Sequence, residues 1–151
     1  MTGYYDSPIG FLQIDTQEGC IVGVKIVPQV KEGEKDPLAE ECAKQIREYL
    51  EGERTHFDLP IRLTGTAFQR QVWEELGRIA YGQIASYGDI AAALGKKGAA
   101  RAVGAACGKN PVWILVPCHR VVGKNGTLTG YAGGVEIKER LLQLERERPQ
   151  G

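Results

Sequence analysis

The hydrophobic pattern of the chain changes once, and this change limits the possible folds more than any other feature. Short runs of β-branched and aromatic residues, separated by turn sequences, follow one another within residues 1–27, and one further short apolar run lies at Val112–Val116. From residue 37 onward, apolar residues recur at helical spacing instead. Strands followed by helices in a chain of 151 residues predict an α+β fold, with a small N-terminal sheet-plus-helix subdomain and a mainly helical second subdomain.

The expected elements follow from this pattern and from the residues that begin and end helices. Strands are expected at residues 4–5, 11–14 and 21–27. Helices are expected at residues 37–50, 66–79, 86–94, 99–107 and 135–146. The extended segment 54–65 divides the chain into an N-terminal α/β subdomain with its connector, 1–64, and a C-terminal domain, 65–151. Two short helices joined by the turn Gly95–Gly98 resemble a helix-turn-helix.

The charge is distributed unevenly although the formal net charge is zero. Residues 1–64 hold seven basic against twelve acidic residues, and residues 65–151 hold twelve against seven. No acidic residue occurs between Asp89 and Glu136. A surface built from this stretch has a positive potential suited to phosphate groups. Chance clustering in a Gly- and Ala-rich segment is the alternative explanation.

Several classes of protein are disfavoured by composition. No stretch approaches the roughly 20 apolar residues of a membrane-spanning helix, and the first residues lack the pattern of a signal peptide. We therefore expect a cytoplasmic protein with no membrane partner. The four cysteines are widely spaced with no C-x-x-C pair, which indicates free thiols. The spacing of cysteines and histidines does not indicate a metal site, so we expect neither metal nor cofactor.

The most informative segment for chemistry is Val116-Pro-Cys-His-Arg120. A cysteine reacts as its thiolate, and the imidazole of His119 is placed to take the proton of Cys118. A carboxylate is needed to orient such an imidazole, and Glu145 in the last helix is a candidate. A cysteine beside a histidine, taken alone, is more often a buried structural residue.

The surrounding residues add to this pair. The segment Gly108–Val122 resembles the active-site signature of the O6-alkylguanine-DNA alkyltransferases, also called methylated-DNA–protein-cysteine methyltransferases. Other segments match this family in the same order: Tyr81–Ile90, Ala99–Gly104, Tyr131–Gly134 and Lys138–Leu142. The resemblance runs from about Phe68 to Glu145, whereas the first sixty residues share only the layout. It implies a ribonuclease-H-like N-terminal subdomain, then a winged-helix-like helix-turn-helix subdomain.

The resemblance also implies a function. The protein would repair double-stranded DNA by flipping an O6-alkylated guanine out of the helix and accepting its alkyl group irreversibly on Cys118. His119 would act as the base through a water molecule, with Glu145 behind it. Tyr87 would donate a proton to the leaving guanine, and Lys138 would stabilise the thiolate. The protein would act once, as a monomer, from the minor groove.

The family's remaining roles carry over onto matching positions. Asn110 would orient the active-site loop, and Arg101 would fill the gap left by the flipped base. The residues expected to contact the guanine are Tyr131, Ala132, Gly133, Val121 and Trp113. The residues expected to contact DNA beside Arg101 are Ser86, Ala100, Ala102 and Gly104. Trp113 departs from the family pattern, in which a smaller residue or proline is frequent. The resemblance therefore does not define the shape of the pocket wall or the size of the alkyl group that is accepted.

The same residues have other readings. The small side chains of the helix 99–107 suit either a close approach to DNA or tight helix packing, and Arg101 among them favours DNA. Tyr87 is also typical of a half-buried packing tyrosine. Lys138 and Glu145 share one helix face, which in many helices is simply solvated. Rival classes are a non-catalytic lesion sensor, a Cys-His hydrolase and a helix-turn-helix regulator. The first and last make no use of Cys118, and a hydrolase makes no use of Arg101.

Overall fold

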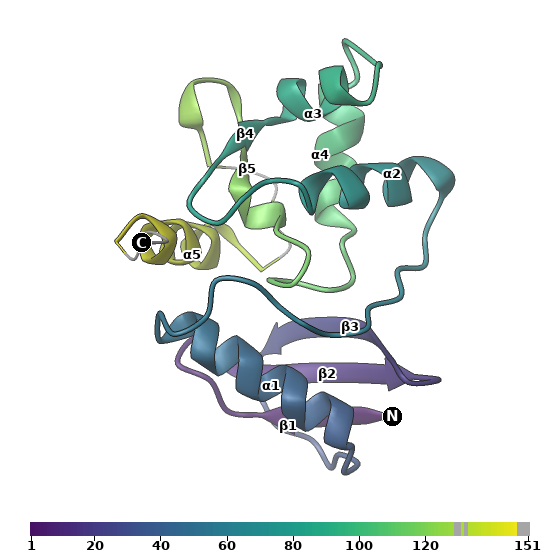
Figure 1. The fold of residues 1–151 in the computed structure, drawn as a ribbon, viewed down its shortest axis with the longest axis vertical. Coiled ribbons are helices and arrows are strands. Elements are labelled where there is room, and N and C mark those ends of the chain that lie inside the picture. The colour runs from purple at the N-terminus through teal and green to yellow at the C-terminus, as the bar shows by residue number, and fades with distance from the viewer. Residues whose placement is uncertain (129–130, 132, 148–151) are drawn as a thin grey trace. The chain divides into compact units, whose positions relative to one another are not determined.

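The structure is a computed structural model that describes residues 1–128, 131 and 133–147 (Figure 1). The chain forms two compact units. The first contains Met1–Thr64 and also Pro111–Leu115, and the second contains Gly65–Asn110 and Val116–Gly151. The return of residues 111–115 to the first unit was not anticipated from the sequence. Strands lead the chain and helices dominate its second part, which confirms the α+β class.

The first unit is built on a three-stranded antiparallel sheet in the order β1-β2-β3. Its strands are β1 (Thr2–Tyr5), β2 (Phe11–Gln17) and β3 (Cys20–Val27). Alternate residues of β2, such as Leu12 and Ile14, are fully buried, as expected for a sheet with one covered face. Figure 1 shows helix α1 (Pro37–Leu50) lying across this sheet. Asp36 caps α1 by accepting the backbone N–H of Leu38.

The outer side of β3 is paired rather than left open. Ile21 forms a bridge to Ile61 in the connector, and Val24 forms another to Val112. The backbone N–H of Val24 donates to the carbonyl of Pro111 at 2.9 Å. A strand edge needs such partners because its unpaired backbone groups otherwise bind other chains. This pairing explains why residues 111–115 belong to the first unit.

In the residues of the second unit that the structure describes, there are four helices and a short parallel strand pair. The helices are α2 (Ala67–Leu76), α3 (Tyr87–Ala93), α4 (Ala100–Gly108) and α5 (Val135–Glu147), and single 3-10 turns occur at η1 (Cys118–Arg120) and η2 (Lys124–Gly126). Thr66 and Ser86 cap α2 and α3 with complete capping boxes, the second with Asp89 as predicted. The indole N–H of Trp73 in α2 donates to the carbonyl of Ala106 in α4 at 2.9 Å.

Some boundaries differ from the prediction. Helix α2 ends at Leu76 rather than Ile79, because the chain leaves the helix at Gly77 through a turn. The parallel pair β4 (Ala85–Ser86) and β5 (Val121–Val122) was not expected, since two residues show no alternation that a sequence pattern reveals. In the part of the chain that the structure describes, no helix is long and apolar enough to cross a membrane.

Candidate active site and groove

The candidate nucleophile, Cys118, begins the 3-10 turn η1 and is only 2% exposed. Its backbone N–H donates to the carbonyl of Val116 at 2.8 Å, which folds the chain sharply at Pro117. The side-chain amide of Asn110 donates to the same Val116 carbonyl at 3.1 Å. Asn110 therefore fixes the loop that carries Cys118.

The carboxylate of Glu145 is bound by groups from two other segments of the chain, the 3-10 turn η1 and the turn at Gly82. Its Oε2 lies 2.7 Å from His119 Nε2 and accepts from Arg120 Nη2 at 3.0 Å. Its Oε1 accepts from Arg120 Nε at 2.9 Å and from the backbone N–H of Gly82 at 3.1 Å. Both His119 and Glu145 are almost completely buried. The expected pairing of these two side chains is present, and Arg120 and Gly82 are partners that the sequence did not reveal.

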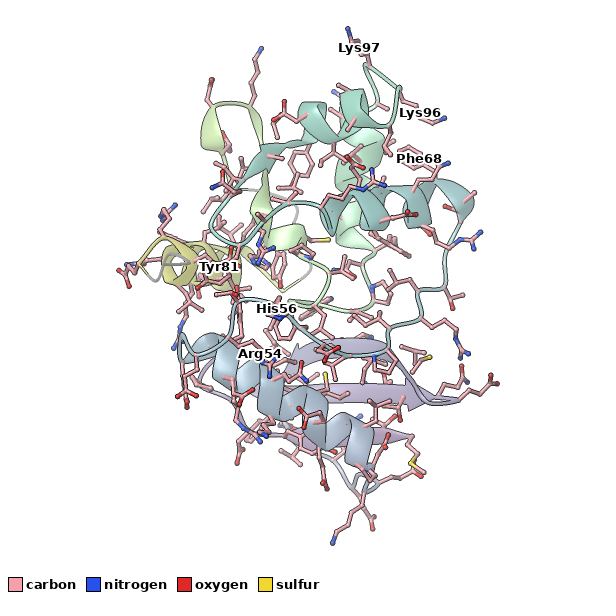
Figure 2. All side chains as sticks on the ribbon, in the orientation of Figure 1. Arg54, His56, Phe68, Tyr81, Lys96 and Lys97 are labelled. Atoms are coloured by element: carbon pink, nitrogen blue, oxygen red, sulfur yellow. The ribbon has the colours of Figure 1, made fainter. Side chains whose placement is uncertain are left out.

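Arg120 is held by more than the carboxylate. Its Nη1 donates to the carbonyl of Ile79 at 2.7 Å, and its guanidinium lies 5.8 Å from the centre of the Tyr81 ring. Figure 2 shows Tyr81 beside helix α5, which carries Glu145. The two hydrogen bonds from Nε and Nη2 of Arg120 form a bidentate contact with the Glu145 carboxylate and fix it in one orientation.

The protonation states of this group follow from its surroundings. Burial by itself raises the pKa of Glu145, but hydrogen bonds from His119 and Arg120 outweigh it and lower the pKa to about 2. Burial lowers the pKa of His119, against the opposing effect of Glu145. A charged Glu145 beside a neutral imidazole selects the form with hydrogen on Nε2. Nδ1 is then the nitrogen that accepts a proton.

Helix α5 presents a charged face to the interior of the second unit. The apolar residues Ile137 and Leu144 are only half-buried, whereas Lys138 and Glu145 are buried with Leu141. The solvated-face reading of these two charges is therefore wrong. Since water does not compensate buried charges, each needs partners within the fold.

Lys138 meets Tyr87 and the thiols. Its Nζ donates to Tyr87 Oη at 3.4 Å and lies 5.6 Å from the centre of that ring. Burial lowers the pKa of Lys138, while negative charge on Cys107 and Cys118 acts in the opposite direction. Tyr87, at the start of α3, is half-buried. The structure thus brings together a tyrosine hydroxyl, an ammonium group and the candidate nucleophile.

Cys118 has a second thiol beside it. Burial raises the pKa of Cys118 well above its ordinary value, and a hydrogen bond with Cys107 adds to this, whereas Asn110 and Lys138 lower it. The sequence did not reveal this contact, because the two cysteines come from different elements.

The residues expected to contact the guanine have different places. Tyr131 is buried, and this burial raises its pKa, with the charge of Cys118 acting in the same direction. Val121 is fully buried in β5, and Gly133 is half-buried. Trp113 belongs to the first unit, where its backbone N–H donates to Val24 at 3.1 Å. Ala132 lies outside the described residues.

An open groove of about 730 Å³ runs along the helix-turn-helix. Its lining residues are Ser86, Tyr87, Gly88, Asp89, Ala100, Arg101, Gly104, Lys124 and Asn125. Four residues expected to contact DNA therefore line one groove, while Ala102 is exposed but outside it. Lys124 and Asn125, from η2, are lining residues that the sequence did not single out.

The turn between α3 and α4 carries further positive charge. Figure 2 shows Lys97 at the tip of this turn, and its side chain is exposed. The ammonium of Lys96 lies 6.0 Å from the centre of the Phe68 ring, in the first turn of α2. This contact places Lys96 of the basic turn against helix α2.

The second unit thus combines a buried candidate nucleophile, Cys118, and the His119–Glu145 pair with a groove along a helix-turn-helix. These features define a class of two-unit α+β protein with a candidate reactive cysteine. Two family models cover almost the whole chain. The 6-O-methylguanine DNA methyltransferase ribonuclease-like domain matches residues 1–63, and the DNA binding domain of the same name matches residues 67–147. The chain belongs to the 6-O-methylguanine DNA methyltransferase family.

Named relatives agree with this assignment. The methylated-DNA–protein-cysteine methyltransferase of Mycolicibacterium paratuberculosis is 45% identical over 147 residues, which cover 93% of this chain and 89% of that protein. The constitutive methylated-DNA–protein-cysteine methyltransferase of Bacillus subtilis is 46% identical over 152 residues, covering 93% and 92%. The crystal structure of Mycobacterium tuberculosis OGT in complex with DNA superposes with a TM-score of 0.89 at 43% identity, covering 97% of this chain and 93% of that chain.

Proposed function

We propose that this protein repairs DNA by transferring an alkyl group from the O6 atom of guanine to Sγ of Cys118, once per molecule. The observation that carries the proposal is the environment of this thiol. It is buried beside Lys138 and next in sequence to a histidine whose Nε2 lies 2.7 Å from Glu145. Family membership supports the same reaction.

The first step is deprotonation of the thiol. Neutral His119 accepts the proton of Cys118 on Nδ1 through a water molecule, because Nε2 is committed to Glu145. The imidazolium that results is stabilised by the ionised Glu145 carboxylate. Lys138 stabilises the thiolate by its charge.

The second step is transfer. The thiolate attacks the alkyl carbon, so an S–C bond forms while the bond from that carbon to O6 breaks and its electron pair stays with guanine. The hydroxyl of Tyr87 donates a proton to the departing guanine. Lys138 donates a hydrogen bond to the Tyr87 oxygen at 3.4 Å and stabilises the negative charge that develops there. The product thioether has no good leaving group, so the protein is consumed in one turnover.

We further propose that the groove binds duplex DNA from the minor groove. Exposed Arg101 would enter the base stack and occupy the space of the flipped nucleotide. Small residues on α4, such as Gly104, let the helix approach the DNA closely. Ser86 and Lys124, at the groove wall, face the phosphates. The protein would act as a cytoplasmic monomer, and Tyr131, Val121 and Gly133 of the second unit would contact the base.

The test is intact mass after incubation with a duplex carrying one O6-methylguanine. Wild type is expected to gain the mass of one methyl group in place of hydrogen, with peptide mapping placing it on Cys118. Cys118→Ser is expected to gain nothing, and Cys20→Ser, which removes a cysteine of the first unit, is expected to behave as wild type. Tight binding to the lesion without any mass gain would instead identify a non-catalytic lesion sensor.

A further inference from the structure

Two thiols that are separate in the sequence meet inside the second unit. Cys107 lies in the last turn of α4 and Cys118 begins η1. They are 1% and 2% exposed, and their side chains are hydrogen-bonded to each other. The other two cysteines, Cys20 and Cys42, belong to the first unit.

The pair shares one cation. The charge of Lys138 favours the thiolate form of both Cys107 and Cys118. When two thiols are hydrogen-bonded, loss of one proton is favoured because the remaining S–H donates to the thiolate, and loss of the second is opposed. A thiolate that contacts a second thiol is the arrangement that forms a disulfide after oxidation.

We propose that Cys107 and Cys118 are the site of a reversible disulfide, formed when the protein meets an oxidant of the peroxide class. The thiolate attacks one peroxide oxygen, so an S–O bond forms, the O–O bond breaks and hydroxide leaves, which gives a sulfenic acid. The second thiol then attacks this sulfur. An S–S bond forms, the S–O bond breaks, and the oxygen leaves as water with the thiol's proton.

The disulfide would protect the reactive thiol. Without a neighbouring thiol, a sulfenic acid is oxidised further to sulfinic acid, which is irreversible in most proteins. A protein that uses Cys118 once gains from a form that thiol reductants restore. This consequence for activity rests on the proposed function, whereas formation of the cross-link does not.

The cross-link is tested on the full chain with hydrogen peroxide. Free thiols are then blocked with N-ethylmaleimide under denaturing conditions before intact mass and peptide mapping. Wild type is expected to carry maleimide on two of its four cysteines, to have lost two hydrogen atoms, about 2 Da, from the other two, and to yield one peptide pair joined through Cys107 and Cys118. Cys107→Ala is expected to show sulfinic acid at Cys118 instead. Cys42→Ala, which removes a buried cysteine of the first unit, is expected to keep the cross-link.

The wild-type map alone can overturn the proposal, whatever the fold of the variants. Sulfinic acid at Cys118 with Cys107 still free, or a disulfide from Cys118 to another cysteine, would show that the pair does not act together.

Activity is measured in parallel as methyl transfer from the duplex before oxidation, after oxidation and after dithiothreitol. Transfer by wild type and Cys42→Ala is expected to fall by the fraction cross-linked and to return with the reductant, and transfer by Cys107→Ala is not expected to return. If untreated protein transfers no methyl group, the proposed function is wrong, but the peptide map still tests whether the cross-link forms. If cross-linked protein still transfers the group, the cross-link does not silence the site.

Discussion

The two units bury different kinds of side chain. The first unit buries apolar residues with two uncharged polar side chains, Thr16 and Gln45. Among the described residues of the second unit, four buried side chains around the proposed acceptor are basic or acidic: His119, Arg120, Lys138 and Glu145. Burying a charge costs free energy that only close partners offset. The second unit therefore buries charged side chains at a free-energy cost that the first unit does not have. These side chains surround the proposed active site.

One buried thiol from each unit, Cys42 from the first and Cys118 from the second, shows the same difference. In the first unit, burial raises the pKa of Cys42 to about 12, with the charge of Glu41 acting in the same direction. Burial also raises the pKa of Cys118, but Asn110 and Lys138 oppose it. Cys42 is thus an inert core residue, whereas Cys118 has groups that stabilise its thiolate.

The largest effect is expected from Glu145→Gln. This change leaves the buried guanidinium of Arg120 without an opposing charge, which typically costs about 3–5 kcal/mol of unfolding free energy. Urea unfolding measures the loss, and Trp73 fluorescence in a Trp113→Phe background reports the second unit. Gln45→Met in the first unit removes two hydrogen bonds with the backbone of Asp58 and one with the half-buried carboxylate of Glu41, and is expected to cost only about 1–3 kcal/mol. Equal losses in both units would contradict the comparison.

Acid is expected to destabilise the second unit first. The pKa of Glu145 is lowered to about 2 in the folded state from an ordinary value of 4.5, so its contribution is present above pH 4.5 and is lost as the pH falls towards 2. The contribution is about 3 kcal/mol. His119 acts in the same direction at higher pH, because its folded pKa lies below its ordinary 6.5 and the unfolded chain takes up the proton.

Unfolding is measured from pH 7 to 3 with Trp73 as the reporter. Glu145→Gln is expected to lose the part of this pH dependence below 4.5. A variant that follows the wild-type pH curve over that range would show that another group titrates there.

The sequence predicted the order of elements well where the pattern was long. The strands 11–14 and 21–27, helix α1 and the cap at Ser86 follow from alternation, spacing and capping residues. It also paired His119 with Glu145, through a motif and a resemblance. It missed Arg120 and Gly82 because hydrogen bonds to Glu145 across 25 and 63 residues leave no local pattern. Cys107 was missed for the same reason, since a contact between α4 and η1 depends on tertiary packing.

The next effect is on rate rather than stability. Tyr87→Phe removes the hydroxyl that contacts Lys138 and is proposed to donate the proton, while the half-buried ring is kept. Single-turnover methyl transfer is expected to slow by about a hundredfold, the low end for loss of a general acid. The urea midpoint is expected to stay unchanged. Tyr4→Phe, the same change at a half-buried tyrosine of the first unit, is expected to transfer at the wild-type rate.

The smallest effects concern the DNA surface, where the units differ in charge rather than in burial. Lys97→Ala removes one exposed cation from the tip of the turn shown in Figure 2 and is expected to weaken binding to any duplex several-fold. The slope of log affinity against log salt is expected to fall by about 1, as for one lost phosphate contact. Lys25→Ala, at an exposed position of β3 in the first unit, is expected to change neither.

Arg101→Ala separates positioning from base flipping, because it is expected to weaken binding to the lesion duplex more than to an undamaged one. Equal losses on both duplexes would make Arg101 a phosphate contact like Lys97 and leave the flipped base without its proposed substitute.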